Sequence, residues 1–198
     1  DIGNLLCEAE KTPPYNTLPV DLQKTKILFA LMFLLRGIPF VDLAYLRKTD
    51  IQGNILRYRR RKTGRSLTVM LIPEALRLMQ LVANKDGDSP YLFPFLSSPE
   101  GTETAYHEYQ SALRAFNHRL SVLKRYVRGH AHLSTYTIRH TWATMAYYCE
   151  IHPGIISEAM GHSSIKVTET YLKPFQNQKI DKANQEVISF VKGYASVF

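Results

Sequence analysis

Two stretches of sequence decide the fold: IRHTWAT at residues 138–144 and MGHSSIKVTETYL at residues 160–172. In the first, apolar residues follow Arg139 by three, six and seven positions, which predicts a helix that packs on a core and aims the guanidinium. A lone arginine beside a buried helical face is more often a structural ion-pair partner than a catalytic group. The second stretch favours a catalytic role, because a glycine at a helix boundary is followed by His162 and, nine residues later, by Tyr171.

Periodicity outward from these stretches predicts a mainly α fold with one small antiparallel β-sheet (α+β). The apolar segment that ends at Leu35 predicts a buried helix, and residues 39–46 predict a short one. From residue 55 the alternating segment ILRYRR, followed by KTG and the strand-like LTVMLI, predicts a β-hairpin. Further helices are predicted at residues 73–83, 103–124, 137–150, 154–160, 164–171 and 179–191.

The composition is that of a soluble globular protein, since 45% of the 198 residues are apolar and 21% are charged. The longest apolar run, residues 27–35, is about half of what a membrane-spanning helix requires, so no membrane partner is expected. Cys7 and Cys149 lie far apart and outside any CxxC spacing. This spacing argues against a disulfide framework or a zinc knuckle and fits a reducing, cytoplasmic compartment.

The charge is strongly basic, with 25 Lys and Arg against 17 Asp and Glu, and a net charge of +8 is expected of a protein that meets phosphates. Six cations gather on the predicted hairpin: Arg57, Arg59, Arg60, Arg61, Lys62 and Arg65. One interpretation is a solvated strand edge whose charges discourage sheet-to-sheet aggregation. The interleaved Tyr58 favours a surface for a phosphate backbone, because long basic side chains on a pleated strand can straddle a groove.

These motifs together resemble the catalytic domain of the tyrosine recombinases, the phage-integrase family, over nearly the whole chain. IRHTWAT resembles the family's R-H-T-x-A-T box, and MGHSSIKVTETYL resembles the L-G-H-S-S-x-x-T-x-x-Y box that ends in the nucleophile. VDLAYLRKTDI at residues 41–51 resembles the family's E-L-x-x-L-x-x-x-D-I segment, with Asp42 as the acid. Residues 59–73 resemble the sheet that carries the catalytic lysine, and Lys62 matches that lysine.

The resemblance implies that Tyr171 attacks a DNA phosphodiester, which gives a 3′-phosphotyrosine and releases a 5′-hydroxyl. It implies no metal ion and no nucleotide cofactor. A phenol with a pKa near 10 is a poor nucleophile at neutral pH, so cations and proton carriers must surround it. Arg139 would hold nonbridging phosphate oxygens, Lys62 would protonate the leaving 5′ oxygen, and His162 would donate to a phosphate oxygen or accept a proton.

One departure from the family pattern concerns the first catalytic arginine, whose usual place, three residues before Asp42, is taken by Pro39. Arg36 stands one helical turn upstream, and we hypothesise that it delivers its guanidinium to the same phosphate. The alternative is that Arg36 caps the carbonyl end of the preceding helix. In that case a hairpin arginine, or nothing, replaces the missing group.

A second departure is Tyr136, which stands where the family has a histidine three residues before the second arginine. A phenol still donates a hydrogen bond to phosphate, but near pH 7 it is poorly suited to accept a proton. The alternative is a ring that packs on the start of the helix without a catalytic part. His130, His132 and His140 lie near this box, and their spacing does not favour a zinc site.

The resemblance divides the chain into a lead-in or linker (1–16), a catalytic domain (17–175) and a helical tail (176–198). It implies a site-specific recombinase of a bacterial or phage mobile element, monomeric when free and a homo-tetramer on double-stranded DNA, with accessory DNA-bending proteins as further partners. The tail packs either on its own domain or on a neighbouring protomer. The alternatives in function are a catalytically weak or silent DNA-binding or regulatory protein and, further behind, a relaxing topoisomerase.

Overall fold

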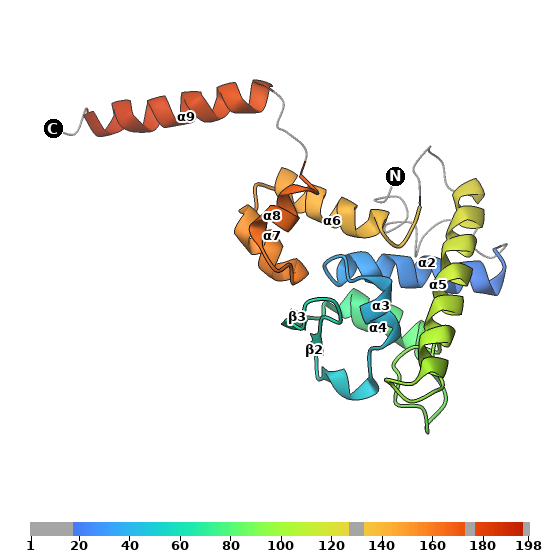
Figure 1. Ribbon diagram of the computed structural model, residues 1–198. Coiled ribbons are helices and arrows are strands. Elements are labelled where there is room, and N and C mark those ends of the chain that lie inside the picture. Colours follow the sequence, from blue (N-terminus) through green and yellow to red (C-terminus); the bar gives the residue numbers. More distant parts are fainter. Residues whose placement is uncertain (1–17, 127–132, 173–176, 196–198) are drawn as a thin grey trace.

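The computed structural model describes residues 18–126, 133–172 and 177–195. Helix α2 (Val20–Leu34) lies at the centre, and helices α4 (Pro73–Val82), α5 (Glu103–Leu123) and α6 (Thr137–Tyr148) all pack against it (Figure 1). From Ile27 to Leu34 helix α2 is apolar on every side, and its residues Phe29 to Met32 are at most 2% exposed. A helix without a polar face must be covered on all sides, which is why the other helices surround it.

A tight turn connects α2 to helix α3 (Phe40–Ala44), where Arg36 and Gly37 both have left-handed backbone angles (φ 61° and 67°). A Cβ atom on Gly37 would lie 3.0 Å from the Cα of Arg139 in α6. Glycine is therefore required here for two reasons, the positive φ and the close approach of α6. The turn thereby brings the end of α2 directly against the helix that carries Arg139.

The sheet has three antiparallel strands in the order β1 (Ile51–Gln52), β2 (Ile55–Arg59) and β3 (Ser66–Met70), entered through a 3₁₀ turn, η2 (Lys48–Asp50). Leu56 pairs with Val69 and faces the core, whereas the neighbouring pair of Arg57 and Thr68 faces outward. The sequence predicted only the β2–β3 hairpin, because a two-residue strand such as β1 is too short to show alternation. The third strand is therefore an addition to the predicted fold.

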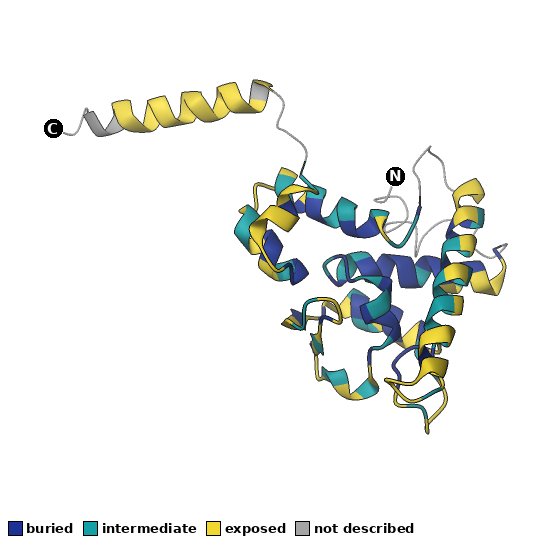
Figure 2. Ribbon diagram, viewed as in Figure 1, coloured by how far each residue is buried: buried dark blue, intermediate teal, exposed yellow. Residues whose placement is uncertain are grey.

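The C-terminal half is helical: a 3₁₀ turn, η3 (Lys124–Tyr126), follows α5, and α6 is followed by α7 (Pro153–Met160), α8 (Ile165–Glu169) and α9 (Asn177–Ala195). A second apolar cluster joins α6 to α7 through Ala143, Ala146, Ile156 and Met160. Helix α9 extends away from the rest of the chain and is exposed along its described length (Figure 2). Among the described residues, none of the helices combines the length and apolarity needed to cross a membrane.

The predicted fold class, mainly α with a small antiparallel sheet, is confirmed, and the predicted helices match the observed ones to within a few residues. One detail of the predicted packing was wrong: the sequence predicts that Met145, six positions after Arg139, packs on the core. The buried residues of α6 include Ile138, Ala143 and Ala146, whereas Met145 is 47% exposed. The predicted lead-in, residues 1–16, lies outside the described residues.

The central position of α2 yields a prediction for Leu31, whose side chain is fully buried. Leu31→Ala should lower the free energy of unfolding by about 2–5 kcal/mol, because the truncated side chain leaves a cavity in a closely packed core. Leu81→Ala is the matched control: Leu81 is 56% exposed on α4, and its truncation should cost about 0.5 kcal/mol or less. Urea denaturation of the whole chain measures both, and equal losses would contradict the assignment of α2 as the core helix.

Candidate active site

Arg139 lies on the first turn of α6 with its guanidinium buried at the junction of three segments. Its Nη1 donates to the carbonyl of Gly37 (2.8 Å), and its Nη2 donates to the carbonyl of Met160 (2.7 Å). Among the described residues it has no carboxylate partner. Burial, and then the neighbouring charge of Arg60, lowers the pKa of Arg139. A buried cation whose described partners include no carboxylate is a place where an anion would be stabilised.

Tyr171 follows α8, and two hydrogen bonds fix its backbone. Its N–H donates to the carbonyl of Thr168 (2.9 Å), and its carbonyl accepts from Thr144 Oγ1 on α6 (3.1 Å). Its ring packs against the α6–α7 cluster. The Tyr171 hydroxyl lies close enough to Arg139 and Tyr136 to influence the pKa of both groups through charge and side-chain hydrogen bonding. The phenol predicted to be the nucleophile thus lies beside the predicted phosphate-binding arginine of the same chain.

His162 follows Gly161, the left-handed residue (φ 65°) that ends α7. Its Nδ1 is 2.8 Å from Thr168 Oγ1, while its Nε2 is buried and has no hydrogen-bond partner among the described residues. Its ring stacks on Tyr171 with the centroids 5.3 Å apart. Burial, and then the charges of Arg139 and of the hairpin, lowers the pKa of His162 to about 4. The imidazole is therefore neutral at pH 7.

Lys62 lies in the turn of the β2–β3 hairpin, exposed and without a hydrogen bond or ion pair to the described residues. Its charge still acts on His162 and helps to lower the pKa of that imidazole, after burial and the charges of Arg139 and Arg60. The neighbouring Thr63 Oγ1 donates to the carbonyl of Gly161 (3.0 Å), which docks the hairpin turn on the end of α7. The lysine is thus held near the histidine while its ammonium group remains free to meet a ligand.

The five arginines predicted to bind DNA divide into two groups. Three of them, Arg57, Arg59 and Arg65, are exposed on the hairpin. Arg60 is only 5% exposed, and its Nη1 donates to Asp42 Oδ2 at 2.5 Å. Arg60 directly follows β2, and its burial continues the alternation of that strand, in which Leu56 faces the core. Arg60 therefore belongs to the interior of the site rather than to the outer basic surface.

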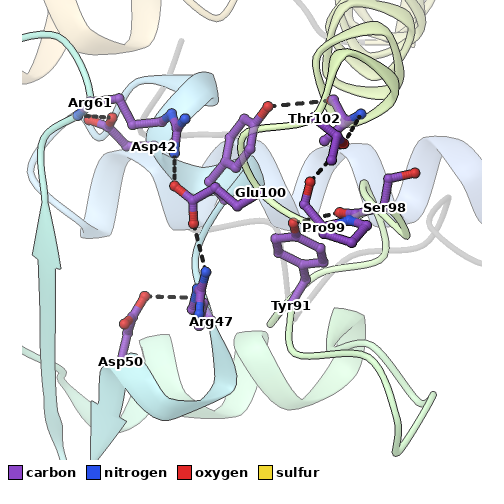
Figure 3. Close-up of polar contacts among 11 residues, drawn as sticks. Asp42, Arg47, Asp50, Arg61, Tyr91, Ser98, Pro99, Glu100 and Thr102 are labelled. Carbon is purple, nitrogen blue, oxygen red and sulfur yellow. Dashed lines mark hydrogen bonds and ion pairs between the residues drawn. The ribbon is translucent and has the colours of Figure 1, made fainter.

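Arg61 is also tied to the protein, because its guanidinium pairs with Glu100. Glu100 lies between Arg61 and Arg47, as Figure 3 shows, and its second oxygen accepts from Arg47 Nη2 at 2.8 Å. The Arg61 guanidinium also lies over the ring of Tyr45, 3.7 Å from the centroid. The backbone N–H of Arg61 donates to Asp42 Oδ1 (3.0 Å). This network fixes the hairpin turn against the loop that precedes α5.

Arg36 and Tyr136, the two departures from the family pattern, occupy different surroundings. The guanidinium of Arg36 donates to the carbonyl of Thr68 on β3 (3.3 Å). Tyr136 is 61% exposed and lies beside the site, with its ring 6.3 Å from that of Tyr171 and 4.4 Å from that of His140. The His140 ring in turn lies 4.1 Å from that of Tyr171. Burial, and then the charge of Arg139, lowers the pKa of His140.

Sequence reasoning missed two groups that position the site. Thr168 is fully buried and faces His162, and Thr144 holds the backbone of Tyr171. Both are small hydroxyl residues whose partners lie on other turns or helices, so no spacing rule singles them out. Within residues 18–126, 133–172 and 177–195, no three His, Cys, Asp or Glu side chains are grouped so that they could hold a metal ion. His130 and His132 lie outside these residues.

The chain belongs to the phage integrase family, whose model matches residues 11–178. Its fold is similar to that of the XerA recombinase (18% identity, 89% of this chain and 66% of that chain, TM-score 0.56). It is also similar to a Tn1549 transposon integrase in complex with circular intermediate DNA (16% identity, 94% of this chain and 64% of that chain, TM-score 0.60). A third similar structure is a lambda integrase tetramer bound to a Holliday junction (14% identity, 85% of this chain and 45% of that chain, TM-score 0.53). The chain thus spans less than two thirds of the length of these proteins. Comparison with curated proteins gave no match.

The lowered pKa of His162 predicts a specific loss of stability in acid. Between pH 6.5 and about 4 the imidazole of His162 is protonated in the unfolded chain but neutral in the folded chain. The free energy of unfolding should therefore fall as the pH falls through this window. The full shift corresponds to at most about 3 kcal/mol. His162→Gln should remove this part of the pH dependence, measured by urea denaturation at a series of pH values.

His118→Gln is the matched control, because His118 is exposed on α5. It should retain the pH dependence of the parent protein. If His162→Gln and His118→Gln show the same slope of unfolding free energy against pH between 4 and 6.5, the imidazole of His162 is not held neutral by its surroundings.

Proposed function

We propose that this chain is the catalytic part of a site-specific DNA recombinase that cuts and rejoins strands through a 3′-phosphotyrosine intermediate. One observation carries the proposal: the buried guanidiniums of Arg139 and Arg60 lie near each other, that of Arg139 lies beside the Tyr171 hydroxyl, and of the two only Arg60 has a carboxylate partner, Asp42, among the described residues. A buried excess of positive charge beside a nucleophile is suited to a substrate anion, and a DNA phosphodiester is such an anion. Family membership supports the same substrate class.

In the proposed reaction the Tyr171 oxygen attacks the phosphorus and the bond to the 5′ oxygen breaks. Arg139 binds nonbridging oxygens with the N–H groups not used by the two carbonyls, and this stabilises the extra charge of the transition state. Lys62 donates a proton to the leaving 5′ oxygen. Reversal on a partner strand regenerates the phenol and joins the new 5′-hydroxyl, so the chain is returned unchanged.

His162 enters this reaction as a neutral imidazole. Its contact with Thr168 fixes the ring, since a hydroxyl can either donate to Nδ1 or accept from it. In the first case Nε2 carries a proton and donates to a phosphate oxygen, and the phosphate itself takes up the proton of Tyr171. In the second case Nε2 offers a lone pair that accepts the proton of Tyr171. Both roles use a nitrogen that has no partner among the described residues.

We further propose that the exposed arginines of the hairpin, Arg57, Arg59 and Arg65, contact the DNA backbone around the cleaved phosphate. The tail, residues 176–198, would dock on a neighbouring protomer of a homo-tetramer on DNA, since α9 exposes Ile180, Val187 and Phe190. A catalytically silent DNA-binding protein is the second candidate, because Pro39 offers no guanidinium where the family has its first arginine. Chemistry at Tyr171 separates the two.

The proposal predicts a covalent DNA adduct at Tyr171. A pool of nicked duplexes with random sequence around the nick serves as the substrate, because loss of a short leaving strand traps the intermediate. The parent chain should form an adduct that survives denaturing electrophoresis, and Tyr171→Phe should form none, since it lacks the attacking oxygen. Tyr148→Phe, on an exposed tyrosine at the end of α6, should form the adduct normally.

Adduct formation by Tyr171→Phe would show that another group is the nucleophile. A parent chain that binds duplex DNA, yet forms no adduct with any sequence of the pool, would favour the silent DNA-binding protein instead.

Tyr136 provides a further prediction, because its hydroxyl interacts with that of Tyr171. Tyr136→Phe should slow adduct formation by about tenfold, the effect of one neutral hydrogen bond. Tyr106→Phe, on an exposed tyrosine of α5, is the control and should leave the rate unchanged. Single-turnover rates on sequences recovered from the pool measure both. Equal rates for Tyr136→Phe and the parent chain would assign the ring to packing alone.

A further inference from the structure

Arg60 differs from the arginines on either side of it. Arg59 and Arg61 are exposed, whereas Arg60 is only 5% exposed at the point where β2 enters the hairpin turn. Its backbone is held on both sides, because its N–H donates to the carbonyl of Arg65 and its carbonyl accepts from Gly64 N–H, each at 2.8 Å. The guanidinium of Arg60 is therefore directed inward by a rigid turn.

The guanidinium of Arg60 uses only part of its hydrogen-bonding capacity. Its Nη1 donates to Asp42, while Nε is buried without a hydrogen-bond partner among the described residues. Nη2 likewise makes no hydrogen bond to them. The Nε–H and Nη2–H bonds of an arginine are parallel and match two oxygens of a phosphate. A buried donor without a partner is costly, so a ligand that supplies the acceptor would be stabilised there.

The side chain of Arg60, whose Nε and Nη2 have no hydrogen-bond partner among the described residues, lies against the turn at Gly161. Arg139 binds the same turn, and His162 follows it. A Cβ atom on Gly161 would lie 2.8 Å from Arg60 Cγ, and Arg139 donates to the carbonyl of the preceding residue, Met160. Arg60 therefore touches the turn from one side while Arg139 holds it from another. The charge of Arg60 also contributes to the lowered pKa of both Arg139 and His162, in each case after burial.

We propose that Arg60 is a catalytic residue that binds the scissile phosphate through Nε and Nη2, and that it takes the part of the arginine missing at position 39. The inference deepens the proposed function and rests on it. Asp42 balances one of the two buried guanidiniums, so the phosphate is the counterion of the pair. The end of β2 thereby supplies a group that the start of α3 does not.

Arg36 is the competing candidate and the surroundings favour Arg60. One N–H of the Arg36 guanidinium donates to the carbonyl of Thr68 (3.3 Å), which directs the side chain into a hollow between β3 and α7 that Arg65 and Glu158 also line. Glu158 offsets part of the positive charge of that hollow, and the hydrogen bond of Arg36 there is exposed, whereas the Nε of Arg60 is buried without a partner among the described residues. Arg60 instead lies against the turn at Gly161, which directly precedes His162.

Arg60→Lys separates a catalytic role from a structural one, because it retains the charge for Asp42 but lacks the parallel N–H bonds. Once the Tyr171 adduct has been established, its rate of formation at saturating DNA should fall by about 100- to 1,000-fold in Arg60→Lys. Binding of duplex DNA should change by less than about threefold, since the net charge is unchanged. Arg36→Lys should lose less than about tenfold in rate. Arg114→Lys on α5 is the control for the substitution itself and should match the parent.

A second measurement does not depend on the reaction. Dimethyl phosphate, a phosphodiester anion, is added to isotope-labelled Tyr171→Phe protein, and the arginine Nε–H signals are followed by nuclear magnetic resonance. The signals of Arg60 and Arg139 should shift together, and that of Arg114 should not. If Arg60→Lys fails to fold, as a thermal melt would reveal, the phosphate titration still decides the role of Arg60.

The outcomes distinguish the two proposals. If the adduct forms at the parent rate in Arg60→Lys and the Arg60 signal does not move, Arg60 is a structural partner of Asp42 and the inference is wrong, while the recombinase function stands. If no adduct forms in the parent but the Arg60 signal shifts with phosphate, the anion site is supported and the recombinase proposal fails.

Discussion

The carboxylate of Asp42 joins the helical core to the hairpin. It lies on the buried face of α3, and its two oxygens receive the guanidinium of Arg60 and the backbone N–H of Arg61. Removal of one partner of such a buried pair leaves an uncompensated charge, which typically costs about 3–5 kcal/mol. The hairpin cannot leave α3 without this cost, and Glu100 holds it from the other side through Arg61 and Arg47. The position of Lys62, at the tip of the hairpin, therefore depends on an acid twenty residues earlier in the chain.

Backbone carbonyls, rather than acids, orient the other buried cation. Arg139 is held by Gly37 and Met160, which fix its direction without cancelling its charge. The same excess of positive charge, added to burial, lowers the pKa of His162 and keeps its imidazole neutral. A bound phosphate would supply the missing negative charge and raise the pKa of that imidazole again. Substrate binding and the proton affinity of the histidine are thus coupled through one local field, without a change of fold.

Sequence patterns were sufficient for the helices and for the residues of the two boxes, because these depend on spacing within one helix and its flanks. Arg139, His162 and Tyr171 lie together as the boxes suggested, although the roles assigned to them remain predictions. The sequence predicts that Arg60 belongs to the outer basic surface, since six cations in nine residues hide the alternation that buries it. The contacts of Thr168, Thr144 and Glu100 join segments distant in sequence or on different turns, and periodicity carries no information about them.

Binding of a phosphate depends on where the donor atoms lie. It does not depend on which helix or strand carries the side chains that supply them. The side chain of arginine reaches several ångströms from its Cα, so the start of α3 and the end of β2 can both aim at one point if a common partner lies between them. Asp42 is such a partner, because it lies on α3 and binds Arg60, the residue that directly follows β2. If Arg60 binds the phosphate as proposed, a proline at position 39 costs the site no donor as long as Asp42 remains. The carboxylate of Asp42 therefore determines where the guanidinium of Arg60 lies, whichever element carries that arginine.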